Sequence, residues 1–483
     1  MHSRLSRRQF LAGTAAFGAL SSSFIPAPAH AQGHSTGMGP ARLTVGRRII
    51  EVNGKPATVF GIHQADGTAG LLLDAGLWFH VELDNQAGEP TILHWHGQTP
   101  PPDQDGVVET GYASLIAPGE SWTYTFAPRS GTHWMHSHHG LQEQMLLAAP
   151  LIVRAEEDRR ADVQDAIIIL HDFSFRDPAE ILAGLTGGTP PDHAGAMAGH
   201  DMDMDGMDKR GVAEDVNDID YDAYLANDRT LDDPLVVRTE REGRVRLRLI
   251  NGATSTAFWI DLGVLEGTVI AVDGDAVEPV VDRHFPIAQG QRLDIMIRLP
   301  SAGAFPVLAL REGGQERTGI ILASPGAAVT KIANKVDVAA PAADLSLERR
   351  LVSTLPRAMR QPDITHRIAL TGQMRPYVWS IDDRTWSNHQ PLRIRQGQRV
   401  VLEMANRSRM AHPMHLHGHH FQVIGIDGSI VHGAMRDTVL VPAGSTVTVA
   451  FDADNPGRWL LHCHNLFHMA TGMMTEIAYG HAG

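Results

Sequence analysis

Alternation of apolar and polar residues, broken by turn residues, dominates the first third of the chain. Residues 77–83 and 121–126 alternate in this way, and residues 117–120, with the sequence Ala-Pro-Gly-Glu, are typical of a turn. Successive side chains of a strand point to opposite faces, so the alternation indicates strands with one buried face. The pattern predicts a first β-sandwich domain in residues 40–158, ending at the charged run 156–160.

Two further regions show strand patterns of the same kind. Residues 162–325 hold an apolar run typical of a buried strand, 166–170, and two alternating runs, 245–250 and 294–299. An alanine-rich linker then leads to a third region, residues 345–483, in which the predicted strands are 391–395, 400–404, 421–424 and 446–451. The sequence therefore predicts an all-β protein made of three consecutive β-sandwich domains.

Length and composition agree with several domains built from short strands. Without its first 31 residues the chain is still too long for one core, since single cores stop growing at roughly 250–300 residues. Its 47 glycines and 28 prolines are spread along the sequence, which favours strands and turns over long helices.

Residues 193–208 interrupt the second region with a polar, glycine-rich stretch that has no apolar periodicity. It carries two histidines and several acids together with four methionines, Met197, Met202, Met204 and Met207. Thioether sulfur is a soft ligand that suits Cu(I), so the stretch is a candidate site for a substrate copper ion. The alternative is a solvated acidic loop whose methionines have no role.

The first 31 residues have the features of a twin-arginine export signal. Arg7 and Arg8 stand in Ser-Arg-Arg-Gln-Phe-Leu, an apolar run follows, and Ala29-His30-Ala31 matches a signal cleavage site. The apolar run is short and interrupted by glycine and serine, so we expect no stable membrane anchor. The prediction is export by the twin-arginine machinery to the periplasm.

The charge balance is acidic. The formal net charge is −14, and removal of the three arginines of the signal leaves −17. This charge argues against nucleic acid or an anionic membrane as a partner. The single cysteine, Cys463, excludes an internal disulfide, and in an oxidising compartment it needs burial or a bound metal.

Cys463 lies in the stretch with the richest chemistry, His462-Cys463-His464, which is followed by His468 and Met473. On a strand the two flanking histidines would face one way and the thiolate the other. Thiolate, imidazole and a weak thioether are the ligands of a blue-copper site, and a further histidine is needed to complete it. The flanking histidines would then serve a second metal site behind the cysteine.

Three more His-x-His pairs supply candidate ligands. They are His94 with His96, His136 with His138, and His415 with His417, the last preceded by His412. Together with His462 and His464 these make eight imidazoles, a set that suits several copper ions better than magnesium or calcium.

At these residues the sequence resembles the multicopper oxidases. His-Trp-His-Gly, His-Ser-His, His-Pro-x-His-Leu-His-Gly and His-Cys-His-x3-His-x4-Met all occur in the family's order. The resemblance covers nearly the whole mature chain and is specific in the first and third regions. It implies three cupredoxin-like Greek-key domains and four copper ions.

The resemblance also implies which residues bind which copper. The type 1 ligands would be His412, Cys463, His468 and Met473, and the type 2 ligands would be His94 and His415. The type 3 pair would be bound by His96, His136, His138, His417, His462 and His464. The cluster of three ions should therefore lie between the first and third domains.

Proton supply depends on acidic residues near that cluster. Asp105 matches the family's acid, although an Asp before Gly is also a common turn residue. Several relatives carry a second acid directly after the last histidine, whereas this chain has Met469 there. A second carboxylate relay is therefore in doubt, and the pattern is more similar to the copper-resistance branch.

The resemblance implies an oxidase that couples one-electron oxidations to the reduction of dioxygen to water. Cu(I) is the leading substrate, as in copper tolerance, and phenols or aromatic amines, as in laccases, are the alternative. A copper-free relative of the cell-division branch would share the fold, but it would lack the ligand set found here.

Overall fold

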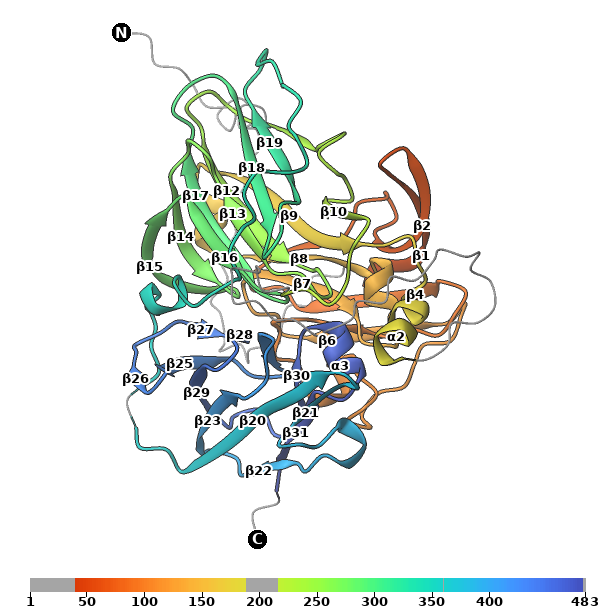
Figure 1. Ribbon diagram of the computed structural model, residues 1–483, viewed down its shortest axis with the longest axis vertical. Helices are drawn as coiled ribbons and strands as arrows, with labels where there is room; N and C mark the ends of the chain where they lie inside the picture. The colour runs from red at the N-terminus through yellow and green to blue at the C-terminus, as the bar shows by residue number, and fades with distance from the viewer. Residues whose placement is uncertain (1–39, 188–215, 359, 481–483) are drawn as a thin grey trace, which may run out of the picture. The chain divides into compact units, whose positions relative to one another are not determined.

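The computed structural model describes residues 40–187, 216–358 and 360–480. Within these ranges the strands form three successive pairs of sheets (Figure 1), coloured from red and orange through green to blue along the chain. The predicted twin-arginine signal, residues 1–31, and the methionine-rich stretch, residues 193–208, lie outside the described residues.

The first pair joins two four-stranded sheets. One has the order β2-β1-β4-β6, formed by β1 (Ala41–Val52), β2 (Lys55–His63), β4 (Phe79–Gln86) and β6 (Ser121–Phe126). The other has the order β3-β8-β7-β5, formed by β3 (Leu71–Asp74), β5 (Leu93–His94), β7 (Gly131–Ser137) and β8 (Ala148–Arg154). Their inward residues, such as Val81 and Leu151, share one buried core, as the alternation predicts.

The second pair is larger. A six-stranded sheet, β10-β9-β12-β17-β14-β15, contains β9 (Gln164–Phe173), β10 (Ala223–Ala226), β12 (Arg244–Asn251), β14 (Gly267–Val272), β15 (Asp275–Asp282) and β17 (Arg292–Arg298). A five-stranded sheet, β11-β19-β18-β13-β16, contains β11 (Val236–Arg238), β13 (Phe258–Asp261), β16 (His284–Ile287), β18 (Ala304–Arg311) and β19 (Arg317–Ala323). The predicted strands 166–170 and 245–250 fall inside β9 and β12.

The third pair carries the C-terminal motif. One sheet, β21-β20-β23-β29-β25-β26 with β27 beside β25, contains β20 (Ile364–Met374), β21 (Tyr377–Ile381), β23 (Arg399–Asn406), β25 (Phe421–Ile426), β26 (Ser429–Ile430), β27 (Met435–Arg436) and β29 (Thr446–Asp452). The other, β22-β31-β30-β24-β28, contains β22 (Leu392–Ile394), β24 (His412–Leu416), β28 (Thr438–Val441), β30 (Arg458–Cys463) and β31 (Met474–Tyr479).

Helices in the described ranges are few and short. The α-helices are α1 (Glu156–Arg160), α2 (Pro178–Thr186) and α3 (Leu466–Ala470). The 3-10 turns are η1 (Pro102–Gln104), η2 (Gln142–Met145), η3 (Glu348–Arg350) and η4 (Trp386–Asn388). Among the described residues, no helix is both long enough and apolar enough to cross a membrane.

The second region also reaches onto the third. Ile181 of α2 and Ile219 belong to the same buried cluster as Trp379, Leu416 and Phe467 of the third region. These contacts come from the two segments that flank residues 188–215. The second region is therefore packed against the part of the third region that carries the C-terminal motif.

Candidate metal centres

Cys463 forms a compact three-residue cluster with His412 and His468. Its Sγ lies 3.6 Å from Nδ1 of each histidine, and the two Nδ1 atoms are 3.1 Å apart. The point equidistant from these three atoms is about 2 Å from each, close to the length of a bond between a first-row metal ion and nitrogen. All three side chains are fully buried, so the cluster fits a thiolate-bound copper ion.

Local structure explains how residues five positions apart meet at this cluster. β30 ends at Cys463, and Asn465 begins α3 by accepting hydrogen bonds from the backbone N–H groups of Phe467 and His468, at 3.1 and 3.2 Å. The short helix turns His468 back toward the thiol. Met473 is fully buried, and its backbone carbonyl accepts a hydrogen bond from the backbone N–H of Cys463 at 3.0 Å. The chain therefore returns to Cys463 at this residue.

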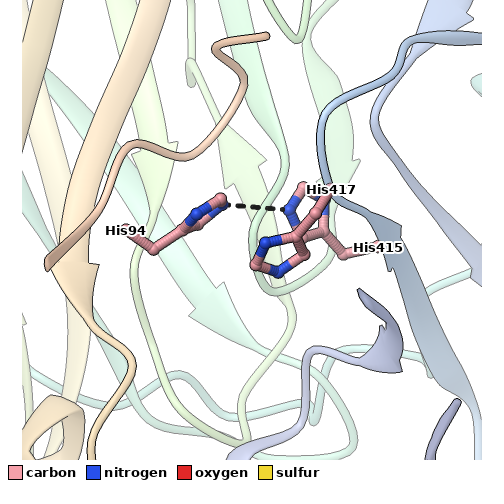
Figure 2. Close-up of side chains that lie close together, drawn as sticks. All are labelled: His94, His415 and His417. Atoms are coloured by element: carbon pink, nitrogen blue, oxygen red, sulfur yellow. Dashed lines mark hydrogen bonds between the residues drawn. The ribbon is translucent and has the colours of Figure 1, made fainter. Parts of the chain in front are cut away.

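The four His-x-His pairs converge on a second, larger cluster. Strand pairing brings the histidines of each region together. His94 is paired with His136 in the first region, and His415 is paired with His462 in the third. Figure 2 shows His94, from the first region, facing His415 and His417 of the third, with 3.4 Å between Nε2 of His94 and Nε2 of His415. Nε2 of His417 and Nε2 of His462 are 3.0 Å apart.

The C-terminal motif places its two flanking histidines on one side and its cysteine on the other, as the alternation predicts. His462 and Cys463 belong to different clusters, since ligand atoms of His138, His417 and His462 lie within 4.8 Å of one another, and so do those of His94, His96 and His136. The ring of His464 is 5.0 Å from that of His96 and 5.2 Å from that of His136. One strand end thus serves two metal-binding clusters.

Unpartnered ring nitrogens indicate that this second cluster is built for metal ions. Buried nitrogens without a hydrogen-bond partner include Nδ1 of His96, Nε2 of His136, Nε2 of His138 and both ring nitrogens of His464. Buried polar atoms are normally satisfied, so such a concentration needs an explanation. Copper ions bound by these nitrogens would satisfy them, and the residues present therefore fit the metal that the motifs imply.

Asp105, predicted as a proton donor, touches two of the eight histidines. Its Oδ2 lies 2.9 Å from Nδ1 of His417, and its backbone carbonyl accepts a hydrogen bond from Nδ1 of His94 at 3.0 Å. The side chain is buried, and its Oδ1 has no hydrogen-bond partner. Asp105 is therefore more than a turn residue, although its role in proton transfer stays a prediction.

Three further carboxylates contact the cluster and escaped sequence reasoning. Oε2 of Glu143 lies 3.0 Å from Nδ1 of His136, Oε2 of Glu109 lies 3.5 Å from Nδ1 of His138, and Oδ1 of Asp437 lies 3.1 Å from Nε2 of His96. Burial raises the pKa of Glu143 to about 7. Glu143 was within reach of sequence analysis, because it follows the second histidine pair by a few residues, but nothing in the sequence marks Asp437.

Met469, the position where relatives carry an acid, is partly exposed. It lines a cavity of about 490 Å³ together with Glu109 and His138. A carboxylate is thus present on this side of the cluster, supplied by a residue distant in the sequence.

Asp218 is the other residue that sequence reasoning missed. Its side chain is fully buried, and its Oδ2 lies 2.9 Å from Nε2 of His468 and accepts a hydrogen bond from the Tyr377 hydroxyl at 2.5 Å. Its Oδ1 has no partner. The second region, which carries no His-x-His pair, therefore contributes a carboxylate to the cysteine-containing cluster.

Other histidines in or beside the motifs are not predicted copper ligands. His133, His419 and His420 are buried. Nδ1 of His420 lies 2.5 Å from Oδ2 of Asp275, and its Nε2 lies 3.6 Å from Oδ2 of Asp437. His139 is partly exposed. Trp95 packs in the first core, and Trp134 stacks on His136 with 4.3 Å between ring centroids, as expected for packing beside the ligands.

Comparison with known proteins agrees with this geometry. Three family models described as multicopper oxidase match residues 45–158, 196–324 and 359–482. The chain is 34% identical to the multicopper oxidase MmcO of Mycobacterium tuberculosis, over 83% of this chain and 79% of that protein. It is 26% identical to a copper resistance protein A homolog of Pseudomonas syringae pv. tomato, over 99% of both chains.

Solved structures show the same fold. Fet3p, a multicopper oxidase that functions in iron import, superposes with a TM-score of 0.74 at 18% identity, covering 91% of this chain and 90% of that one. A multicopper oxidase from Pseudomonas thermotolerans gives a TM-score of 0.67 at 24% identity, covering 91% and 98%.

The three pairs of sheets are thus three cupredoxin domains, and their two buried clusters fit the type 1, type 2 and type 3 copper ions of this fold. The chain belongs to the multicopper oxidase family, and it is an enzyme that couples oxidation of a substrate to reduction of dioxygen.

Proposed function

We propose that the electrons of this oxidase come from Cu(I). In the net reaction, four Cu(I) ions, one dioxygen molecule and four protons give four Cu(II) ions and two water molecules. The observation that carries the proposal is the carboxylate of Asp218, whose Oδ2 lies 2.9 Å from Nε2 of His468 in the cysteine-containing cluster. A negative charge with one unpartnered oxygen favours a cation over a neutral ring.

The copper ligands are proposed as the motifs imply. His412, Cys463, His468 and Met473 hold the type 1 ion, and His94 and His415 hold the type 2 ion. The type 3 pair is held by His96, His136, His138, His417, His462 and His464. When bound, these ions accept single electrons at the type 1 site and carry out the reduction of dioxygen at the other three.

The protein's own residues supply position and protons. Asp105 holds His94 and His417 in place through their Nδ1 atoms, so Nε2 of each faces the cluster. Its Oδ1 lies 3.3 Å from Nδ1 of His94 without a hydrogen bond and is the atom that would exchange a proton. We assign Asp105 as the proton-donating residue of the reaction.

Copper tolerance in the periplasm is the setting that we propose. The twin-arginine motif at Arg7 and Arg8 supports export, and relatives named copper resistance protein A support the physiological role. Expression of the full chain in a host with a functional twin-arginine pathway should yield protein shortened after Ala31. Substitution of Arg7 and Arg8 by lysine should retain it in the cytoplasm, and unchanged export would contradict this proposal.

The substrate proposal can be tested at Asp218 with a matched control. Asp218→Asn keeps the size of the side chain and removes the charge, and we expect Cu(I) oxidation to fall at least about tenfold in kcat/KM, equivalent to about 1.4 kcal/mol. Asp220→Asn changes an exposed carboxylate two residues away and should have little effect. Equal Cu(I) kinetics in both variants would contradict the role of Asp218.

Laccase-type oxidation of phenols is the second candidate, and the methionine-rich stretch separates the two. Replacing Met197, Met202, Met204 and Met207 by serine should raise the KM for Cu(I) while phenol oxidation stays the same or rises. Thioether sulfur binds Cu(I), whereas it offers a phenol only bulk. If phenol kinetics collapse while Cu(I) kinetics are unchanged, the Cu(I) proposal should be abandoned.

A further inference from the structure

Asp437 lies between two of the predicted copper ligands and contacts both. Its Oδ1 lies 3.1 Å from Nε2 of His96, and its backbone carbonyl lies 2.9 Å from Nδ1 of His415. The two histidines belong to different domains, and their rings are stacked with centroids 3.8 Å apart. Asp437 is fully buried and is no part of any histidine motif.

The hydroxyl of Thr438 reinforces both contacts. It donates a hydrogen bond to Oδ1 of Asp437 at 2.9 Å, so only its lone pairs remain for other partners. Its oxygen lies 3.1 Å from Nε2 of His96 and 3.1 Å from Nδ1 of His415. Both of these ring nitrogens must therefore carry the proton and donate it.

The consequence is a fixed choice of nitrogen in each ring, because a neutral imidazole has one donor and one acceptor. His96 has only Nδ1 left to bind a metal, and that atom is buried without a hydrogen-bond partner. His415 has only Nε2 left, and that atom faces Nε2 of His94 at 3.4 Å. Neighbouring stacked rings thus present different nitrogens.

Asp437 is held in its ionised form by Arg292 of the second domain. Nη1 of Arg292 lies 2.6 Å from Oδ1, and Nη2 lies 2.5 Å from Oδ2. Since both oxygens are occupied by a bidentate partner, Asp437 acts beside the ligands and is not a ligand itself.

Arg292 is itself fixed by carbonyl groups. It donates to the carbonyls of Thr132, Asp273 and Gly290 at 3.0 to 3.1 Å. Gly97 of the His-Trp-His-Gly motif has a φ of +87°, and a Cβ there would lie 2.4 Å from Nη2 of Arg292 and 3.0 Å from Oδ2 of Asp437. The glycine of that motif therefore leaves space for this ion pair.

We propose that Asp437, held by Arg292, is a positioning residue that selects Nδ1 of His96 and Nε2 of His415 as the metal-binding nitrogens. The second domain contributes no predicted ligand to the type 1, type 2 or type 3 ions, yet it positions two of those ligands through this ion pair. This inference does not depend on whether Cu(I) or a phenol is the substrate.

The direct test reads the protonated nitrogen in the holoenzyme. In fully reduced, oxygen-free protein labelled with 15N-histidine, all copper is diamagnetic Cu(I), and long-range 1H–15N spectra distinguish Nε2–H from Nδ1–H. We expect His96, identified by loss of its signals in His96→Gln, to carry Nε2–H, and His415 to carry Nδ1–H. The opposite form in either ring of the parent protein overturns the proposal, and His96→Gln serves only to identify the His96 signals.

Variants test whether Asp437 makes the selection. Asp437→Leu removes both carboxylate oxygens, including the acceptor that faces Nε2 of His96, so we expect the Nε2–H signal to disappear and at least one copper ion per chain to be lost. The type 2 electron paramagnetic resonance signal should change, while the blue absorption of the type 1 site stays at the parent level. Arg292→Lys keeps the charge but not the two parallel bonds, and should show a weaker form of the same changes.

The matched control is the Arg248–Asp294 pair. It is also buried in the second domain, with 3.0 Å between Nη1 of Arg248 and Oδ2 of Asp294, and neither residue touches a predicted ligand. Asp294→Asn and Arg248→Lys should lower the unfolding temperature without altering the type 2 signal or the His96 tautomer. If the two sets of variants lose copper equally, or if Asp437→Leu keeps its full copper content and spectra, Asp437 is only a structural residue.

Discussion

Burial of the two clusters acts in different ways on their histidines and on their cysteine. Burial lowers the pKa of most of the cluster histidines, that of His464 to about 3, so these rings are neutral in ordinary buffers. Burial also raises the pKa of the Cys463 thiol, and a bound metal ion must therefore displace its proton. His138 is an exception, because the neighbouring Glu109 carboxylate raises its pKa.

The role of Cys463 can be tested by replacing its sulfur. Cys463→Ser removes the soft thiolate, and we expect the blue absorption and substrate oxidation to be lost, because a hydroxyl is a poor ligand for this copper. The eight-histidine cluster should keep its copper, since none of its ligands changes. Near-normal turnover by copper-loaded Cys463→Ser would contradict the assignment of the type 1 site.

Asp105 makes a second prediction at the scale of one residue. Asp105→Asn keeps the size of the side chain, and we expect dioxygen reduction to slow by roughly 10²-fold or more, the usual scale for a lost acid–base group. Reduction of the type 1 copper by substrate should remain fast in stopped-flow measurements. Asp103→Asn, an exposed neighbour in η1, is the control, and equal rates for both variants would leave Asp105 without a proton-transfer role.

At the scale of the element, the turn from β30 into α3 determines where His468 points. The cap of Asn465 satisfies two backbone N–H groups that a five-residue helix would otherwise leave unpaired. So short a helix has little intrinsic stability, and its orientation depends on this cap and on the packing of Phe467 in the core.

We therefore expect Asn465→Ala to loosen the type 1 site. Loss of the cap should cost about 1 kcal/mol of unfolding free energy and weaken or shift the blue absorption band. Asp177→Ala is a matched control. Asp177 caps α2, because its carboxylate accepts a hydrogen bond from the backbone N–H of Ala179 at 2.8 Å. That variant should lose similar stability with an unchanged blue band, whereas identical spectra in the two variants would refute the special role of Asn465.

At the scale of the whole molecule, the eight-histidine cluster joins the first and third domains, and the second domain holds it from the side. A Cβ at Gly290 of the second domain would lie 2.8 Å from the His464 ring and 3.2 Å from the His96 ring, so its backbone packs directly on the ligands. Metal ions bound across a domain boundary stabilise only the assembled state.

Removal of copper should therefore weaken the coupling of the domains. Scanning calorimetry of the chelated protein should show a lower unfolding temperature and separate transitions, where the copper-loaded protein shows one. An ion present at about 1,000 times its dissociation constant contributes about 4 kcal/mol of stability. Cys463→Ser, which keeps the eight histidines, should still unfold in one transition when loaded with copper. An unfolding temperature that is the same with and without copper would contradict the prediction.

Much of this protein was predictable from the sequence by itself. The strand alternation predicted β6 with its observed bounds. The four His-x-His pairs, together with His412, His468 and Cys463, predicted ten imidazoles and one thiolate that the structure brings into two clusters. These features follow local rules, since alternation along a strand decides which side chains share a face. His462 and Cys463 needed no tertiary information to be assigned to opposite sides.

The tertiary structure alone decided what surrounds the ligands. Asp437 is 341 residues from His96, and Asp218 is 250 residues from His468, so no spacing rule could pair them. A carboxylate without a motif cannot be told in sequence from the many that lie on the surface, because only burial and a fixed arginine partner give it a role. The part played by the second domain could not be predicted for the same reason. It acts on the copper sites through contacts that exist only after the three domains have packed together.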